Sequence, residues 1–264
     1  MLGKLLKYEI RATSRTFLPM YALLIVFALI NKFFITVNAD YLKIPMMISM
    51  SVFVIIIVGI CVMTLVVTIQ RFNKNLLTDE GYLSFTLPVK IHTHIDCKMI
   101  VALLWFALSG IVSAVSIFVM AINKSSIEMF QKVLSEFIPV FNSLGAGGYV
   151  IILEGIVLLI LSTLSCAVTI YAAITIGNMS SKHRLLAGLG AYLGFGVIEQ
   201  IITSIIVSGF GNRWELYFDH ITSAAEASGP VQIVMLWMII YTLIFGAVYY
   251  FLTNWMLKRK LNLE

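Results

Sequence analysis

The chain has 264 residues, of which 60% are hydrophobic and only 12% are charged. Ordinary soluble domains carry about 25% charged residues, so this composition excludes a soluble globular protein. The net charge of +5 comes from basic residues that flank apolar runs, a placement that orients membrane helices and gives no reason to expect a nucleic-acid partner.

The first 16 residues predict an amphipathic helix that lies flat in the cytoplasmic interface of a membrane. At 100° per residue, one side of this helix carries Lys4, Lys7, Arg11 and Arg15, and the other carries Leu2, Leu5, Leu6, Ile10 and Thr13. Glu9 falls at the edge of the apolar side. We therefore expect Glu9 to need a basic partner, for example one from the loop 71–98.

Six apolar runs predict an all-α membrane protein with a single transmembrane domain over 1–264. Each run is long enough to cross a hydrocarbon core of about 30 Å. Of the 18 basic residues, 13 lie on the faces that hold the termini and 5 on the opposite faces. This asymmetry predicts cytoplasmic termini in a bacterial cytoplasmic membrane. The predicted spans are 17–37, 46–69, 98–122, 149–177, 184–209 and 231–253.

The loop between the second and third spans contains NLLTDEGYLSFTLPVK, residues 75–90. Thr78 and Asp79 are residue types that cap helix N-termini, Gly81 permits a turn, and Pro88 ends a helix. This pattern predicts a short surface helix or helical turn on the cytoplasmic face, joined firmly to both spans.

Two external segments are expected to carry helices of their own. Ser125 and Glu128 have capping-box spacing, and apolar residues follow at helical spacing, which predicts an interfacial helix that ends near Pro139. A lid without a function of its own is an equally good interpretation. The segment 210–230 predicts short re-entrant helices, with Gly229 and Pro230 marking the start of the last span.

Two carboxylates lie inside predicted spans, Glu154 and Glu199. Ionisable groups in a membrane are costly and usually face protein or water. One interpretation is an outer vestibule that contacts cargo or couples to protons. The other is a hydrogen bond that holds helices together, with Gln200 or a hydroxyl side chain as partner.

Glycines cluster in the fifth span, at positions 188, 190, 194 and 196. Gly190 and Gly194 form a G-x-x-x-G motif, which lets another helix approach closely. The sequence predicts close helix packing here, either within the chain or between two copies.

Several kinds of chemistry are absent from the sequence. It has no G-x-x-x-x-G-K-[ST], H-E-x-x-H or G-x-S-x-G motif, so we expect a non-enzymatic membrane subunit without catalytic residues. The pair His92 and His94 does not share a helical face, so no metal site is expected. The odd number of cysteines, three, predicts no disulfide framework.

The loop pattern resembles the coupling element of type-2 ATP-binding-cassette permeases. In that family a basic amphipathic N-terminal helix and six spans accompany a cytoplasmic element of the form E-x-G-[TY]-L, followed by leucines, P-V and a lysine that starts the third span. This chain departs from the pattern in two ways: Glu80 directly precedes Gly81, and fewer residues separate that glycine from the proline. The matching residues are Glu80, Gly81, Tyr82, Leu83, Leu87, Pro88, Val89 and Lys98.

The resemblance implies the permease subunit of an exporter that moves a hydrophobic or amphipathic cargo outward, such as a peptide or antibiotic in efflux or self-immunity. ATP and Mg would bind in separate ATPase subunits and no cofactor in this chain. A second copy or a related permease would meet the first and fifth spans, including Gly190 and Gly194. The ATPase-contacting residues would be Thr78, Asp79, Glu80, Gly81, Tyr82, Leu83, Ser84, Pro88 and Glu9.

Two alternatives remain from the sequence. One is the substrate-binding membrane subunit of an importer, which has no use for the long loop 71–98. The other is a secondary transporter that uses Glu154 and Glu199. An intramembrane endopeptidase fits poorly, because the spans contain no histidine beside a glutamate.

Overall fold

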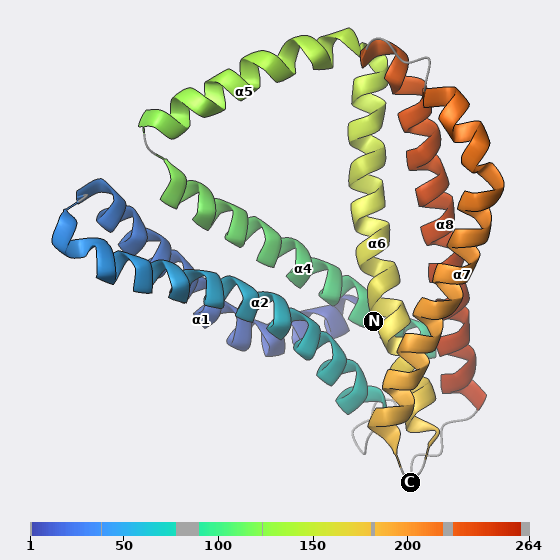
Figure 1. Ribbon diagram of the computed structural model, residues 1–264. Coiled ribbons are helices and arrows are strands. Elements are labelled where there is room, and N and C mark those ends of the chain that lie inside the picture. Colours follow the sequence, from blue (N-terminus) through green and yellow to red (C-terminus); the bar gives the residue numbers. More distant parts are fainter. Residues whose placement is uncertain are drawn as a thin grey trace. The chain divides into compact units, whose positions relative to one another are not determined.

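A computed structural model describes residues 2–37, 39–77, 90–122, 124–180, 183–218 and 224–259. All regular structure within these ranges is helical (Figure 1). One short 3-10 helix, Asp40–Leu42, precedes α2. The α-helices are α1 (Leu2–Val37), α2 (Lys43–Leu77), α4 (Ile91–Ala121), α5 (Lys124–Ser143), α6 (Ala146–Asn178), α7 (Arg184–Phe218) and α8 (Ala224–Arg259).

Six of these helices are long and apolar enough to cross a membrane, namely all except α5. Large apolar side chains remain exposed along them, as expected where the surroundings are lipid and not water. The most apolar stretches of α7 and α8 contain no buried residue. The chain therefore has the architecture of a multi-pass membrane protein, in agreement with the six predicted spans.

Prolines fall inside four of the described helices and end none of them, and Pro45 lies in the first turn of α2. Residues 2–37 form one continuous helix, α1, although it contains Pro19. The expected interfacial helix is therefore not separate from the first span. Helix α5 exists as predicted but continues past Pro139 to Ser143. Pro230 lies inside α8, which begins at Ala224. Apolar surroundings favour keeping the remaining backbone hydrogen bonds, which explains why proline is tolerated in membrane helices.

The segment 210–230 differs from the expectation of separate re-entrant helices. Residues 210–218 continue α7, and residues 224–230 form the beginning of α8. The coupling pattern falls largely on residues 78–89, which lie outside the described residues.

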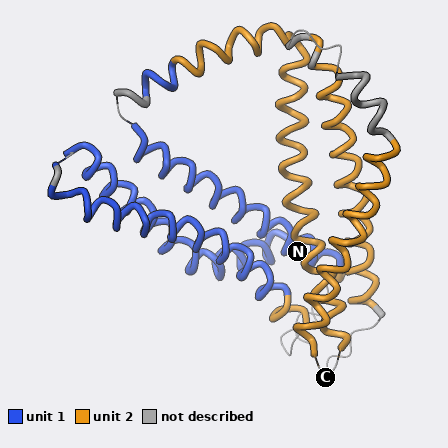
Figure 2. Tube along the Cα trace, viewed as in Figure 1, with its two compact units in different colours: residues 1–72, 92–131 blue, residues 73–91, 132–264 orange. Residues whose placement is uncertain are grey.

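The helices form two compact units (Figure 2). Unit 1 comprises residues 1–72 and 92–131, and unit 2 comprises residues 73–91 and 132–264. The core of unit 1 comes from three helices, with Phe17 from α1, Ile60 from α2 and Trp105 from α4 among its buried residues. In unit 2, α6 packs along both α7 and α8.

Glycine allows α6 and α7 to approach closely at one end of unit 2. A Cβ atom added at Gly177 would lie 2.6 Å from the carbonyl oxygen of Arg184 and 2.8 Å from the Cα of Gly188. Of the glycines in the fifth span, Gly188 therefore makes an intrachain crossing. Gly190, Gly194 and Gly196 have no neighbouring atom within 4 Å of such a Cβ, so they lie on an open face.

Candidate functional site

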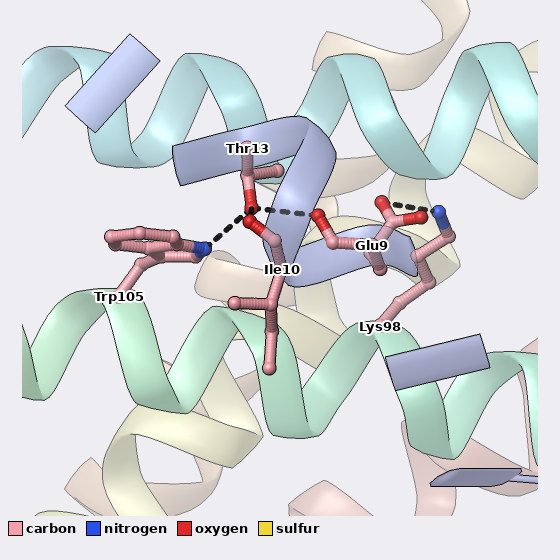
Figure 3. A network of polar contacts seen from close by, with 5 residues as sticks. All are labelled: Glu9, Ile10, Thr13, Lys98 and Trp105. Carbon is pink, nitrogen blue, oxygen red and sulfur yellow. Dashed lines mark hydrogen bonds and ion pairs between the residues drawn. The ribbon is translucent and has the colours of Figure 1, made fainter. Parts of the chain in front are cut away.

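A buried ion pair joins the N-terminal part of α1 to the beginning of α4 in unit 1 (Figure 3). The ammonium nitrogen of Lys98 lies 2.7 Å from the Oε1 atom of Glu9, and the two side chains are 8% and 11% exposed. From the position of Glu9 at the edge of an apolar helix face, we predicted that it needs a basic partner, for example one from residues 71–98. That prediction is confirmed.

One turn further along α1, Thr13 extends this contact. Its hydroxyl donates to the carbonyl oxygen of Glu9 at 2.8 Å and accepts from the indole nitrogen of Trp105 at 2.7 Å (Figure 3). The indole also stacks on Phe17, with ring centroids 4.4 Å apart. Trp105 is 5% exposed, so it is a core residue of unit 1.

A second polar chain crosses unit 1 deeper along the same helices. The hydroxyls of Tyr21 and Ser109 are 2.7 Å apart, and those of Ser109 and Thr64 are 3.2 Å apart. Thr64 donates to the carbonyl oxygen of Ile60 at 2.7 Å. One consistent direction of donation therefore runs from α1 through α4 to α2, and each hydroxyl is satisfied without water.

These contacts follow from the register of the two helices. Glu9, Thr13 and Phe17 recur every four residues on α1, and Lys98 and Trp105 lie two turns apart on α4. The polar groups therefore form a line along one helix–helix seam. Because Lys98 lies near the beginning of α4, the residues that follow the loop 78–89 are fastened to α1.

The residues that precede this loop, 73–77, belong to unit 2 and contact α6 there. Asn178, at the end of α6, donates from its amide nitrogen to the side-chain oxygen of Asn73 at 3.1 Å. Asn73 belongs to the last turns of α2, and the neighbouring Gly177 makes the close crossing with α7. This contact could not be predicted from the sequence, since a lone asparagine near a helix end is common.

The two intramembrane carboxylates have different surroundings in unit 2. Glu199 accepts a hydrogen bond from the hydroxyl of Tyr249 at 2.7 Å, which joins α7 to α8. Thr203 and Tyr241 add a second link between these helices through their hydroxyls, 2.8 Å apart. Glu199 thus matches the interpretation as a helix-holding hydrogen bond, with Tyr249 as the partner that sequence reasoning missed.

Glu154 is more buried and less satisfied. Its side chain is 6% exposed, and its Oε2 atom has no hydrogen-bond partner in the described part of the chain. No group of three His, Cys, Asp or Glu side chains capable of holding a metal occurs within the described ranges.

No family model, curated protein or solved structure matches this chain. What the architecture itself defines is the class: an all-helical, multi-pass membrane protein with a polar seam at the start of α4.

Proposed function

We propose that this chain is the permease subunit of an ATP-driven exporter of the type-2 ATP-binding-cassette kind. The observation that carries the proposal is the fastening of both flanks of the loop 78–89. The α4 flank is held to α1 by Glu9 and Lys98, and the α2 flank is held to α6 by Asn73 and Asn178. Because both flanking helices are held in this way, a push on residues 78–89 is passed into the spans.

The proposed mechanism starts from closure of partner ATPase subunits, which bind ATP and Mg. The ATPase presses on residues 78–84 and Pro88, whose sequence pattern supports this role and which lie outside the described residues. The push moves α4 together with α1 through the buried ion pair. It also reaches α6 through Asn178, and then α7 through the glycine crossing. Reorientation of the spans moves the cargo outward.

Glu9 has a different role in this proposal from direct contact with the ATPase. Its carboxylate forms an ion pair with Lys98, and its side chain is only 11% exposed. Glu9 therefore acts by fastening α1 to α4, while the loop makes the contact.

A second permease copy, or a related permease, is proposed to pack on the open face of α7. Gly190 and Gly194 have space around them, and the apolar stretch of α7 has no buried residue. Small residues on such a face allow another backbone to come close in a membrane.

A secondary transporter is the competing candidate, favoured by one observation: the unsatisfied carboxylate of Glu154. A proton- or ion-coupled carrier needs such a group, whereas Glu199 is already hydrogen-bonded to Tyr249.

The double substitution Glu80→Ala with Tyr82→Ala tests the exporter proposal. We expect the altered chain to insert and assemble normally but to lose most of its cargo-dependent stimulation of the partner ATPase, because both changes fall in the coupling pattern. The measurement is ATP hydrolysis by the reconstituted complex with and without cargo. Lys90→Met, a change at an exposed residue that is not among the proposed ATPase contacts, serves as control. Full stimulation in the double variant would refute the coupling role.

A further inference from the structure

The position of Glu154 on α6 is fixed by its neighbours along the helix. Gln232 of α8 donates to the carbonyl oxygen of Gly147 at 3.2 Å. A Cβ added at Gly246 of α8 would lie 3.4 Å from the hydroxyl oxygen of Ser165. Gly147 and Ser165 therefore both face α8. On this face of α6, buried and half-buried residues recur at steps of three and four: Ile151, Glu154, Leu158, Leu161, Ser165, Val168 and Ala172.

Glu154 thus lies in the apolar seam that packs α6 on α8, two turns inside α6. A carboxylate enclosed in such surroundings is costly unless a positive charge or a hydrogen-bond donor accompanies it. Its Oε2 atom has no hydrogen-bond partner among the described residues. The described residues of α6, of α7 from Leu185 to Gly209 and of α8 from Ser228 to Leu257 include no Lys, Arg or His. These stretches of the three helices therefore offer no cation to Glu154.

A groove on the surface of α6 and α8 begins one residue after Glu154 along α6. It has a volume of about 560 Å³ and starts at Gly155 and Leu158, the residue after Glu154 and the residue one turn on. Met238 and Leu158 make it apolar, while Ser162, Tyr241 and Thr242 add hydroxyls. Its volume is in the range of pockets that take small organic ligands.

We propose that Glu154 and this groove form a binding site for an amphipathic organic cation, whose charged group pairs with the carboxylate and whose apolar body lies between α6 and α8. The charge complementarity decides the occupant, because a neutral lipid chain would fill the groove but leave the carboxylate uncompensated. The inference rests on the proposed export function, to which it adds the class of cargo. The methionine side chains that line the groove are flexible, so they can adapt to cargo of variable shape.

The test measures binding to the chain alone, so its outcome is independent of any ATPase. The full chain is reconstituted in nanodiscs of zwitterionic lipid, and equilibrium dialysis measures binding of tetraphenylphosphonium after subtraction of empty nanodiscs. Tetraphenylborate, which has the same shape and the opposite charge, is the matched probe. We expect saturable binding of the cation and none of the anion.

Two variants locate the site. Glu154→Gln keeps the shape of the side chain and is expected to weaken cation binding at least tenfold. Gly155→Leu is expected to do the same by filling the groove, since no atom lies within 4 Å of a Cβ at that position. The controls are Glu128→Gln, an exposed carboxylate on α5, and Gly110→Leu on α4, where a Cβ also meets no atom. Both should bind like the unaltered chain.

Three results would overturn the inference: cation affinity in Glu154→Gln within twofold of the unaltered chain, equal binding of both ions, or no saturable cation binding at all. In the last case Glu154 serves a smaller cation such as a proton. None of these results bears on whether the chain couples to an ATPase.

Discussion

Replacing Lys98 by Met is expected to destabilise the protein by about 3–5 kcal/mol, the cost of leaving one partner of a buried ion pair uncompensated. In the unaltered chain the Glu9 side chain is 11% exposed and lies 2.7 Å from the ammonium nitrogen of Lys98. In the variant this buried carboxylate would face an apolar side chain instead. The measurement is the free energy of unfolding in mixed micelles, from a titration with dodecyl sulfate followed by circular dichroism.

The matched control and the double variant separate charge pairing from general damage. Lys90→Met removes an exposed lysine near the beginning of the same helix and should change the free energy of unfolding by less than about 0.5 kcal/mol. Adding Glu9→Gln to Lys98→Met should recover a large part of the loss, because the stranded charge is gone. If the change in the free energy of unfolding of the double variant equals the sum of the changes measured for Lys98→Met alone and Glu9→Gln alone, the ion pair does not hold α1 to α4.

Introducing Val at Gly177 is expected to cost about 3 kcal/mol, the upper end of typical overpacking effects. The new Cβ would collide with backbone atoms, namely the carbonyl oxygen of Arg184 at 2.6 Å and the Cα and N of Gly188 at 2.8 Å. Backbone atoms cannot rotate away as a long side chain can. The helices α6 and α7 must then separate, and the same titration measures the loss.

Gly194→Leu provides the contrast, because its Cβ would meet no atom within 4 Å. We expect its free energy of unfolding to stay close to that of the unaltered chain. On the proposed dimer face, however, the larger side chain should reduce cross-linking between copies in detergent. A Gly177→Val protein as stable as the unaltered chain would show that the crossing is not a tight contact.

Hydrophobicity and length were enough to predict the six spans, because a helix of about 20 apolar residues crosses the bilayer and satisfies all its backbone hydrogen bonds within itself. The need of Glu9 for a basic partner also followed from the sequence, because a carboxylate at the edge of an apolar helix face requires one, and the structure shows that this partner is Lys98. Helix α5 was predicted from its apolar period, and its end was placed early because proline was treated as a terminator.

What the sequence could not supply is which residues meet across a seam. Periodicity gives a face, but not the partner helix, so Glu154 and Glu199 were equivalent until the structure placed Tyr249 beside only one of them. The same holds for the glycines, of which Gly188 makes an intrachain crossing while Gly190 and Gly194 lie open. The bond from Trp105 to Thr13 depends on two helices far apart in the chain.

The central claim, that this chain is driven by a separate ATPase, is tested most directly by purifying it from its native membrane in mild detergent and identifying the co-purifying proteins by mass spectrometry. The account predicts an ATP-binding-cassette ATPase, which is lost when residues 78–84 are scrambled in a chain that still inserts. Purification without any such ATPase, repeated after cross-linking in the membrane, would contradict the account and favour a secondary transporter that depends on Glu154.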